Sequence, residues 1–246
     1  MSGNIDDGGS PNPRFHRFGL IAGFAVFVAA YSLFLSHAFV QDNPKAPFTV
    51  TRQKSIEAPM AKESKASTDG TTAVFAAGCF WCSEAAFEQL TGVSAVESGY
   101  SGGTADTANY EMVCSGLTGH AEAIRITYDP AKITYEQLLD VFFDAHDPTQ
   151  LNRQGNDVGT QYRSAIFYAN ETEKQQASEK IEKLNAAKKF GKPVVTKLEP
   201  LAAFYAAEGY HQGFAQNNPL HPYIQAASVP KVCKVREKHA ELIRKD

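Results

Sequence analysis

The sequence predicts a domain of the α+β class, built as a two-layer α/β sandwich with long functional loops. Two observations support this fold class. Short apolar segments of β-prone residues alternate along the chain with segments of helical periodicity, and three long segments fit neither pattern. The 246 residues suffice for one such domain with extensions, and a net charge of −3 gives no reason to expect a nucleic-acid partner.

The first part of the chain differs in character from the rest. Basic residues within 14–17 precede an uncharged and mostly apolar run at 18–39, which is long enough to span a bilayer. We expect residues 1–40 to act as a membrane anchor whose basic flank stays in the cytoplasm; a cleaved signal sequence is the alternative. Either one exports the remainder of the chain, and the bacterial periplasm is the expected location.

A polar segment with three prolines follows at 41–72 and shows no sustained apolar periodicity. We interpret it as a flexible linker, because such a composition cannot bury enough apolar surface to fold. The folded domain is therefore expected at 73–246.

Within this domain, the β-prone segments and the helical segments alternate. The strands are expected at 73–77, 93–99, 121–128, 163–168 and 194–200. The helices are expected at 83–90, 134–145, 171–189 and 230–244. Thr134 followed by Gln137 suits a helix start, because these two side chains can form a capping box.

Three segments have no regular pattern and are rich in Gly, Tyr, Asn, Gln and His. They lie at 100–119, 146–162 and 202–222. Long irregular loops in a compact domain are usually functional, so we expect these segments to line a site.

The pentapeptide Gly78-Cys79-Phe80-Trp81-Cys82 joins the first expected strand to the first expected helix. This position places Cys79 at a helix N-terminus, where free backbone N–H groups and the helix dipole stabilise a thiolate. The thiolate is the attacking form of cysteine, so Cys79 is the predicted nucleophile. Cys82 lies on the same helical face, within reach of a disulfide to Cys79.

A Cys-x-x-Cys pair at such a turn also suits a thioredoxin-like disulfide oxidoreductase. A zinc module that uses Cys79 and Cys82 with histidines is a further alternative, although the chain lacks a second Cys-x-x-Cys or a His-x₃₋₅-His pair. The remaining cysteines, Cys114 and Cys233, have no near partner in sequence. We expect Cys114 to be a small buried hydrophobic residue.

Eight short motifs stand in order along the domain. They lie at 78–81, 99–103, 110–114, 118–123, 146–150, 153–157, 159–164 and 207–212. Through these motifs the chain resembles the type A peptide methionine sulfoxide reductases from residue 73 to 245. The resemblance implies a ferredoxin-like mixed sheet with helices, and the reduction of methionine S-sulfoxide, free or protein-bound, to methionine.

The resemblance also implies roles for individual residues. Cys79 attacks the sulfoxide sulfur, and Glu122 matches the acid that protonates the departing oxygen. To act near neutral pH, Glu122 must be buried with a raised pKa. Tyr110 and Tyr162 match the tyrosines whose hydroxyls bind the sulfoxide oxygen.

Phe80 and Trp81 match an apolar wall for the S-methyl group of the substrate. Asp157 matches a residue that orients substrate or nucleophile. Without the resemblance, Glu122 would be an ordinary exposed strand residue that alternates with core positions. Phe80 and Trp81 would belong to the core, and Asp157 would be an ordinary loop aspartate.

The attack leaves a sulfenic acid on Cys79, which a second thiol condenses to a disulfide. Many members of the family have glycine at position 82 and resolving cysteines in a glycine-rich tail. This chain has Cys82 instead and a charged C-terminal segment, so Cys82 is the expected resolving thiol and Cys233 the fallback. Gly209 and Phe214 also depart from the family pattern.

The resemblance implies no prosthetic cofactor and an external dithiol reductant of thioredoxin type. The expected partners are oxidised proteins or free methionine sulfoxide, the reductant, and a membrane bound through residues 18–39. We expect the protein to be a monomer.

Overall fold

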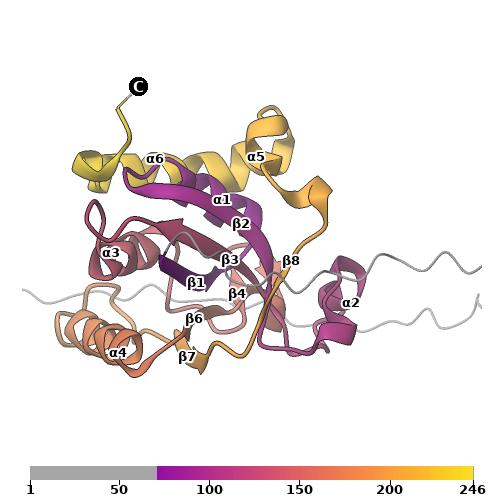
Figure 1. Ribbon diagram of the computed structural model, residues 1–246, viewed down its shortest axis with the longest axis horizontal. Helices are drawn as coiled ribbons and strands as arrows, with labels where there is room; N and C mark the ends of the chain where they lie inside the picture. The colour runs from indigo at the N-terminus through magenta and orange to yellow at the C-terminus, as the bar shows by residue number, and fades with distance from the viewer. Residues whose placement is uncertain (1–70, 246) are drawn as a thin grey trace, which may run out of the picture. The chain divides into compact units, whose positions relative to one another are not determined.

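The structure is a computed structural model that describes residues 71–245. Within them, six strands form one mixed sheet in the order β7-β6-β1-β3-β2-β8 (Figure 1). The strands are β1 (Thr71–Ala77), β2 (Val93–Ser101), β3 (Ala121–Tyr128), β6 (Ser164–Tyr168), β7 (Lys197–Pro200) and β8 (Phe204–Ala206). Only the β6–β7 pair is parallel among these neighbours. The predicted α+β class with a mixed sheet is confirmed.

Three of the helices pack together on one face of the sheet. α1 contacts β2 and β3, α3 contacts β1, and α6 packs against both helices. The helices are α1 (Phe80–Glu88), α2 (Tyr110–Cys114), α3 (Tyr135–Ala145), α4 (Glu171–Ala186), α5 (Phe214–Asn217) and α6 (Val229–Lys238). A π-helical turn, η4 (Ile224–Ser228), leads directly into α6. This layer therefore brings the C-terminal part of the chain against the helix that carries the cysteine motif.

Aromatic side chains fill the space between the sheet and this helical layer. The Phe75 ring on β1 lies 6.0 Å from that of Phe87 on α1 and 5.1 Å from that of Phe142 on α3. Such tilted pairs bury large apolar areas and fix the distance between the layers. The predicted capping box at Thr134 and Gln137 is present and sets the start of α3.

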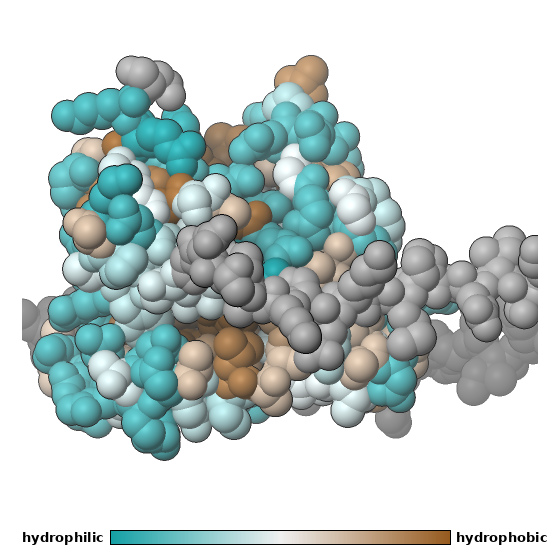
Figure 2. Space-filling view, in the orientation of Figure 1, coloured by the Kyte–Doolittle hydropathy of each residue, from teal (hydrophilic) through white to brown (hydrophobic). Residues whose placement is uncertain are grey.

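The opposite face of the sheet carries smaller side chains, including Val74, Ala123 and Ala165, with Phe167 and Phe204 at their edges. Strand alternation alone explains this division, because successive residues of β1 point to opposite faces. The part of the surface visible in Figure 2 outside the grey atoms is mostly hydrophilic, with small separate apolar groups.

The element boundaries differ from the prediction mainly towards the C-terminus. The strand expected at 194–200 begins only at Lys197, because the Val195 N–H donates to Pro148 O instead of to a strand. The helix expected at 230–244 ends at Lys238. Beyond it, the Arg244 N–H donates to Gln89 O, so the tail is held against the end of α1.

The three long segments contain short elements that were not predicted. These are α2, α5, β8 and a small hairpin of β4 (Arg153–Gln154) and β5 (Asp157–Val158). Elements of two to five residues are too short to show a period, which explains the omission.

The expected anchor at 18–39 and nearly all of the expected linker at 41–72 lie outside the described residues. Between residues 71 and 245, no helix has the length and apolar character needed to cross a membrane.

Candidate active site

Cys79 occupies the turn between β1 and α1, as the sequence predicts. It is the N-cap residue of α1, and Gly78 before it has a φ of +82°. A Cβ at Gly78 would stand 2.5 Å from the Gln154 side chain. Glycine is required there by both the backbone conformation and the close approach, and this tight turn points Cys79 into the site.

Cys79 and Cys82 are both buried free thiols that share a hydrogen bond. Burial raises the pKa of Cys79 well above its ordinary value, and the bond to Cys82 and the Glu122 carboxyl raise it further. The same bond lowers the pKa of Cys82 to about 7 against the effect of burial, with help from Lys231. Burial and the bond to Cys82 thus favour the thiol form of Cys79 and oppose the predicted effect of the helix N-terminus.

Glu122 lies on β3 with only 2% of its surface exposed. The Phe80 N–H donates to its Oε2 at 3.0 Å. Burial, with smaller contributions from the Asp157 and Cys82 charges, raises the pKa of Glu122 to about 8 against the effect of the Phe80 hydrogen bond. The expectation of a buried carboxyl with a raised pKa is confirmed, and the alternative of an exposed strand residue is wrong.

Tyr110 and Tyr162 come from two different loops and are both half-buried. Tyr110 is the first residue of α2, and Tyr162 ends the short helical turn Thr160–Tyr162. Burial raises the pKa of each phenol, and the Glu122 charge adds to the rise at both. The structure therefore brings both predicted tyrosines, in neutral form, around the predicted acid.

Phe80 and Trp81 form an aromatic wall together with two residues of the segment at 207–214. Trp81 stacks on Phe214 with the ring centroids 3.8 Å apart, and the His211 ring lies 5.0 Å from that of Phe80. Trp81 Nε1 donates to His211 Nδ1 at 3.1 Å. Because indole only donates, the neutral His211 ring carries its proton on Nε2. Phe214, a departure from the family pattern, retains an aromatic ring in this wall.

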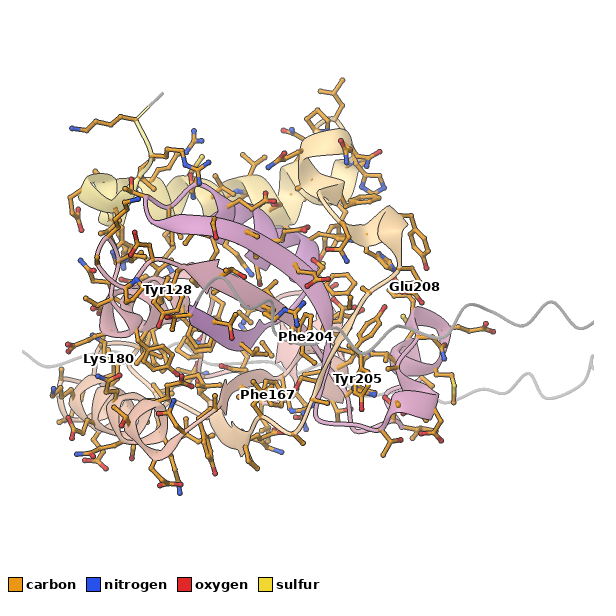
Figure 3. The ribbon with its side chains drawn as sticks, viewed as in Figure 1. Tyr128, Phe167, Lys180, Phe204, Tyr205 and Glu208 are labelled. Atoms are coloured by element: carbon orange, nitrogen blue, oxygen red, sulfur yellow. The ribbon has the colours of Figure 1, made fainter. Side chains whose placement is uncertain are left out.

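Glu208 explains how the 207–212 motif supports the site. Glu208 follows β8 and is labelled in Figure 3. Its Oε1 accepts from the Tyr110 N–H at 2.9 Å, and its Oε2 accepts from the Tyr100 hydroxyl at 2.9 Å. Glu208 thus holds the start of α2, which carries Tyr110, against β2. At the neighbouring Gly209, a Cβ would meet open space, so the acidic residue usual in the family would fit there.

A cavity of about 350 Å³ opens beside the two thiols, and we name it the thiol pocket. Its lining comprises Cys79, Cys82, Gln154, Gly155, Asn156, Asp157, Tyr223, Ala226, Ala227 and Lys231. The Tyr223 hydroxyl donates to Asp157 Oδ2 at 2.5 Å. Hydrogen bonding by this hydroxyl also lowers the pKa of both thiols. Asp157 therefore contacts the cysteines through Tyr223, which sequence reasoning missed.

Lys231 was also missed, although its element was predicted. It lies near the start of α6, and its Nζ donates to Ala77 O at 3.1 Å. Nothing in its local sequence separates it from the other lysines of this segment, because its contact spans 154 positions.

The other two cysteines lie outside the thiol pocket. Cys114 is exposed, so the expectation that it is buried is wrong; it is the last residue of a short surface helix, and its thiol accepts a hydrogen bond from the Tyr110 hydroxyl. Cys233 is also exposed and lines a separate groove of about 400 Å³ with residues of α1 and α5. It follows Lys231 by two positions, which turns it to the opposite side of α6 from the thiol pocket.

This geometry defines a class of protein: a thiol-dependent oxidoreductase with a buried acid and two phenols around its nucleophilic cysteine. Among residues 71–245, no group of three His, Cys, Asp or Glu side chains converges as metal ligands.

Comparison with known proteins agrees with this class. The peptide methionine sulfoxide reductase family matches residues 71–243. The chain belongs to this family, so it is a methionine sulfoxide reductase and an enzyme of oxidative damage repair. It is 53% identical over 172 residues to the peptide methionine sulfoxide reductase MsrA of Deinococcus radiodurans, covering 70% of this chain and 84% of that one.

A second relative and two solved structures support the same assignment. MsrA of Nautilia profundicola is 54% identical over 66% of this chain and 92% of its own. Reduced Mxr1 of Saccharomyces cerevisiae is similar with a TM-score of 0.60 and 33% identity, over 64% of this chain and 91% of that one. Methionine sulfoxide reductase A of Corynebacterium diphtheriae is similar with a TM-score of 0.56 and 35% identity, over 63% of this chain and 78% of that one.

Proposed function

We propose that this enzyme reduces the S epimer of methionine sulfoxide, free or in proteins, with Cys79 as nucleophile and Glu122 as acid. The observation that carries these roles is the buried Glu122 carboxyl, fixed by the Phe80 N–H immediately after Cys79. Below about pH 8 this carboxyl is neutral, so it can donate a proton to an oxygen beside the thiol.

The aromatic wall and the phenols orient the sulfoxide for attack. The S-methyl group lies against Phe80 and Trp81, and the oxygen lies among Glu122, Tyr110 and Tyr162. Glu122 protonates the oxygen while the two hydroxyls stabilise charge that develops on it. The Cys79 sulfur loses its proton and bonds to the substrate sulfur. The protonated oxygen then passes from the substrate sulfur to Cys79, and the bond between the two sulfurs breaks. Methionine leaves, Cys79 is a sulfenic acid, and the proton lost by Cys79 replaces the one given up by Glu122. The net change is transfer of one oxygen atom from the substrate sulfur to Cys79.

Cys82 then resolves the sulfenic acid. Its thiolate attacks the Cys79 sulfur, the S–S bond forms, and the hydroxyl leaves as water after it takes a proton. Three facts support Cys82: it follows Cys79 by three residues, shares the thiol pocket and already holds a hydrogen bond to Cys79. The separate groove that holds Cys233 weighs against the fallback.

An external dithiol of thioredoxin type reduces the Cys79–Cys82 disulfide and restores both thiols, and no prosthetic group takes part. The family resemblance supports this part of the proposal.

We further propose that residues 18–39 anchor the enzyme in a membrane, with the catalytic domain on the non-cytoplasmic side. The basic flank and the uncharged apolar run support this orientation. Protease added to intact spheroplasts is expected to digest the catalytic domain; full protection there, with digestion after lysis, would place the domain in the cytoplasm.

The roles of the cysteines are tested with the full-length protein in detergent, dithiothreitol and pure S or R sulfoxide. Cys79→Ser is expected to abolish turnover of the S epimer. Cys82→Ser is expected to remain active with dithiothreitol and to fail with thioredoxin, whereas Cys233→Ser should resemble the wild type in both. Turnover of the R epimer, or thioredoxin-coupled turnover by Cys82→Ser, would contradict the proposal.

A further inference from the structure

Lys231 places a positive charge in the thiol pocket, on the same side of the reacting pair as Cys82. Its side chain is half-buried, and its Nζ donates at 3.1 Å to a neutral acceptor, the Ala77 carbonyl. The ion pairs of residues 71–245 include Lys238 of α6 but not Lys231. No carboxylate of the described residues therefore neutralises this charge within ion-pair distance.

The charged and titratable groups that face Cys82 come from several elements. Cys79 lies in the same turn, Tyr223 precedes η4, and Asp157 lies on β5. Glu122 on β3 interacts with the thiol through its charge, and Lys231 reaches it from α6. Of this set, Lys231 alone is cationic. The carboxylates oppose a negative charge on Cys82, and Lys231 favours it.

The effect of this cation grows as the reaction proceeds. In the reduced enzyme, the hydrogen bond from Cys79 is the main stabiliser of a Cys82 thiolate. Sulfoxide reduction converts the Cys79 thiol into a sulfenic acid, so the thiol that made this bond no longer exists. Lys231 is unchanged by that step, so its charge remains when Cys82 must attack.

We propose that Lys231 is a positioning residue for the resolving step, which keeps Cys82 as a thiolate while the Cys79 sulfenic acid awaits condensation. Cys82 attacks the Cys79 sulfur and forms the S–S bond, and the S–O bond breaks. The oxygen leaves as water after it accepts a proton, and Lys231 neither gives up nor gains a proton. This inference rests on the proposed function, since it assumes that Cys79 is oxidised and that Cys82 resolves it.

The proposal is tested in single turnover with the full-length protein, reduced and freed of reductant, and then mixed with methionine S-sulfoxide. The release of methionine measures the first step, and the loss of the Cys82 thiol, followed by peptide mass spectrometry, measures the second. The variants are Lys231→Gln, which retains a donor for Ala77 O without the charge, and Lys231→Arg, which retains the charge. Lys234→Gln, one turn further along α6, is the matched control.

We expect the rates of disulfide formation in the wild type and in Lys231→Gln to cross when they are plotted against pH. A rise of one unit in the pKa of Cys82 lowers its thiolate fraction at pH 6 about tenfold, but the more basic thiolate is roughly threefold more nucleophilic. Disulfide formation in Lys231→Gln should therefore be about threefold slower than in the wild type at pH 6 and equal or faster above pH 9. Methionine release should be unchanged, and Lys231→Arg and Lys234→Gln should follow the wild type. A merely structural defect would slow the step at every pH.

A second measurement does not depend on turnover. In a Cys79→Ser background, the pH midpoint of Cys82 alkylation by iodoacetamide should rise by about one unit in Lys231→Gln. An unshifted midpoint together with an unshifted disulfide profile would overturn the role of Lys231. Formation of a Cys79 disulfide in a Cys82→Ser variant would overturn the role of Lys231 as well. If the wild type released no methionine, the proposed function itself would be wrong.

Discussion

The two sides of Cys79 differ in charge although they are equally buried. On one side, Glu122 is neutral near pH 7 and two phenols surround it. On the other side, Cys82 has a pKa of about 7, and the ammonium group of Lys231 lies beside it. We call these the acid side and the thiol side.

The difference matches the two halves of the proposed reaction. The first half needs a proton at the sulfoxide oxygen, and burial supplies a neutral carboxyl because a charged one is poorly solvated there. The second half needs a thiolate, which the same burial would suppress. A cation and hydrogen bonds offset that effect at Cys82. The segment that carries Cys79 therefore lies between a neutral acid and a thiolate. β3 supplies the acid, Glu122, and α6 supplies the cation beside Cys82, Lys231.

The largest effect is expected when the carboxyl of Glu122 on the acid side is replaced. Glu122→Gln keeps the acceptor for the Phe80 N–H but cannot protonate the sulfoxide, so kcat/KM should fall about 10²- to 10³-fold. Wild-type activity should itself decline as pH rises through about 8, where Glu122 loses its proton. The measurement is kcat/KM for the S-sulfoxide from pH 6 to 9.5.

Glu84→Gln is the matched control for this variant. Glu84 is another buried carboxyl of the same region, and burial raises its pKa to about 7. It should lose less than about twofold in kcat/KM. An equal loss in both variants would mean that buried charge in general, and not proton donation by Glu122, limits the rate.

The phenols should give the next largest effect on the acid side. Tyr110→Phe and Tyr162→Phe should each lower kcat about tenfold, because two donors share the charge on one oxygen. Tyr210→Phe serves as control, since that side chain is 63% exposed. Wild-type kcat in one of the two single variants would show that only the other phenol contacts the oxygen.

Much of the acid side could be predicted from the sequence, and much of the thiol side could not. The strand–turn–helix position of Cys79 follows from local patterns, and Glu122 lies in a motif of contiguous residues. Burial of Glu122 could be expected only through the chemistry that the resemblance implies, because strand alternation alone suggests exposure.

The thiol side depends on contacts between distant positions. The hydrogen bond from Tyr223 to Asp157 spans 66 positions, and that from Lys231 to Ala77 spans 154. No period or motif encodes such a pair. The direction of the Cys79 pKa was mistaken for a related reason: the helix N-terminus is visible in the sequence, but the depth of burial that opposes it is not.

A smaller effect is expected from loss of the Tyr223 hydroxyl, which lies beside both thiols. Tyr223→Phe removes the bond to Asp157 and the donor beside both thiols, so disulfide formation should slow about fivefold. Methionine release should slow less, because this hydrogen bond is the weakest of the named influences on Cys79. Single-turnover rates of the two steps provide the measurement; a larger effect on methionine release would assign Tyr223 to the acid side.

The smallest expected effect concerns thermal stability. It tests whether a buried carboxyl with a raised pKa can affect stability without taking part in catalysis. Glu84 has a raised pKa mainly through burial, while the Gly213 N–H donates to its Oε1 at 3.1 Å. Because the folded-state pKa lies above the unfolded value, the favourable protonated form is fully present below about pH 4.5. Its contribution is lost as pH rises through about 7.

Glu84→Gln should therefore melt within about 1 °C of the wild type at pH 5 and a few degrees above it at pH 9. Thermal unfolding followed by circular dichroism at both pH values measures this difference. Parallel pH slopes for the two proteins would show that Glu84 is ionised in the fold at all of these pH values. If the slopes diverge as expected while activity is retained, a raised carboxyl pKa does not by itself make an acid catalyst. What distinguishes Glu122 is then its place beside Cys79 and the two phenols.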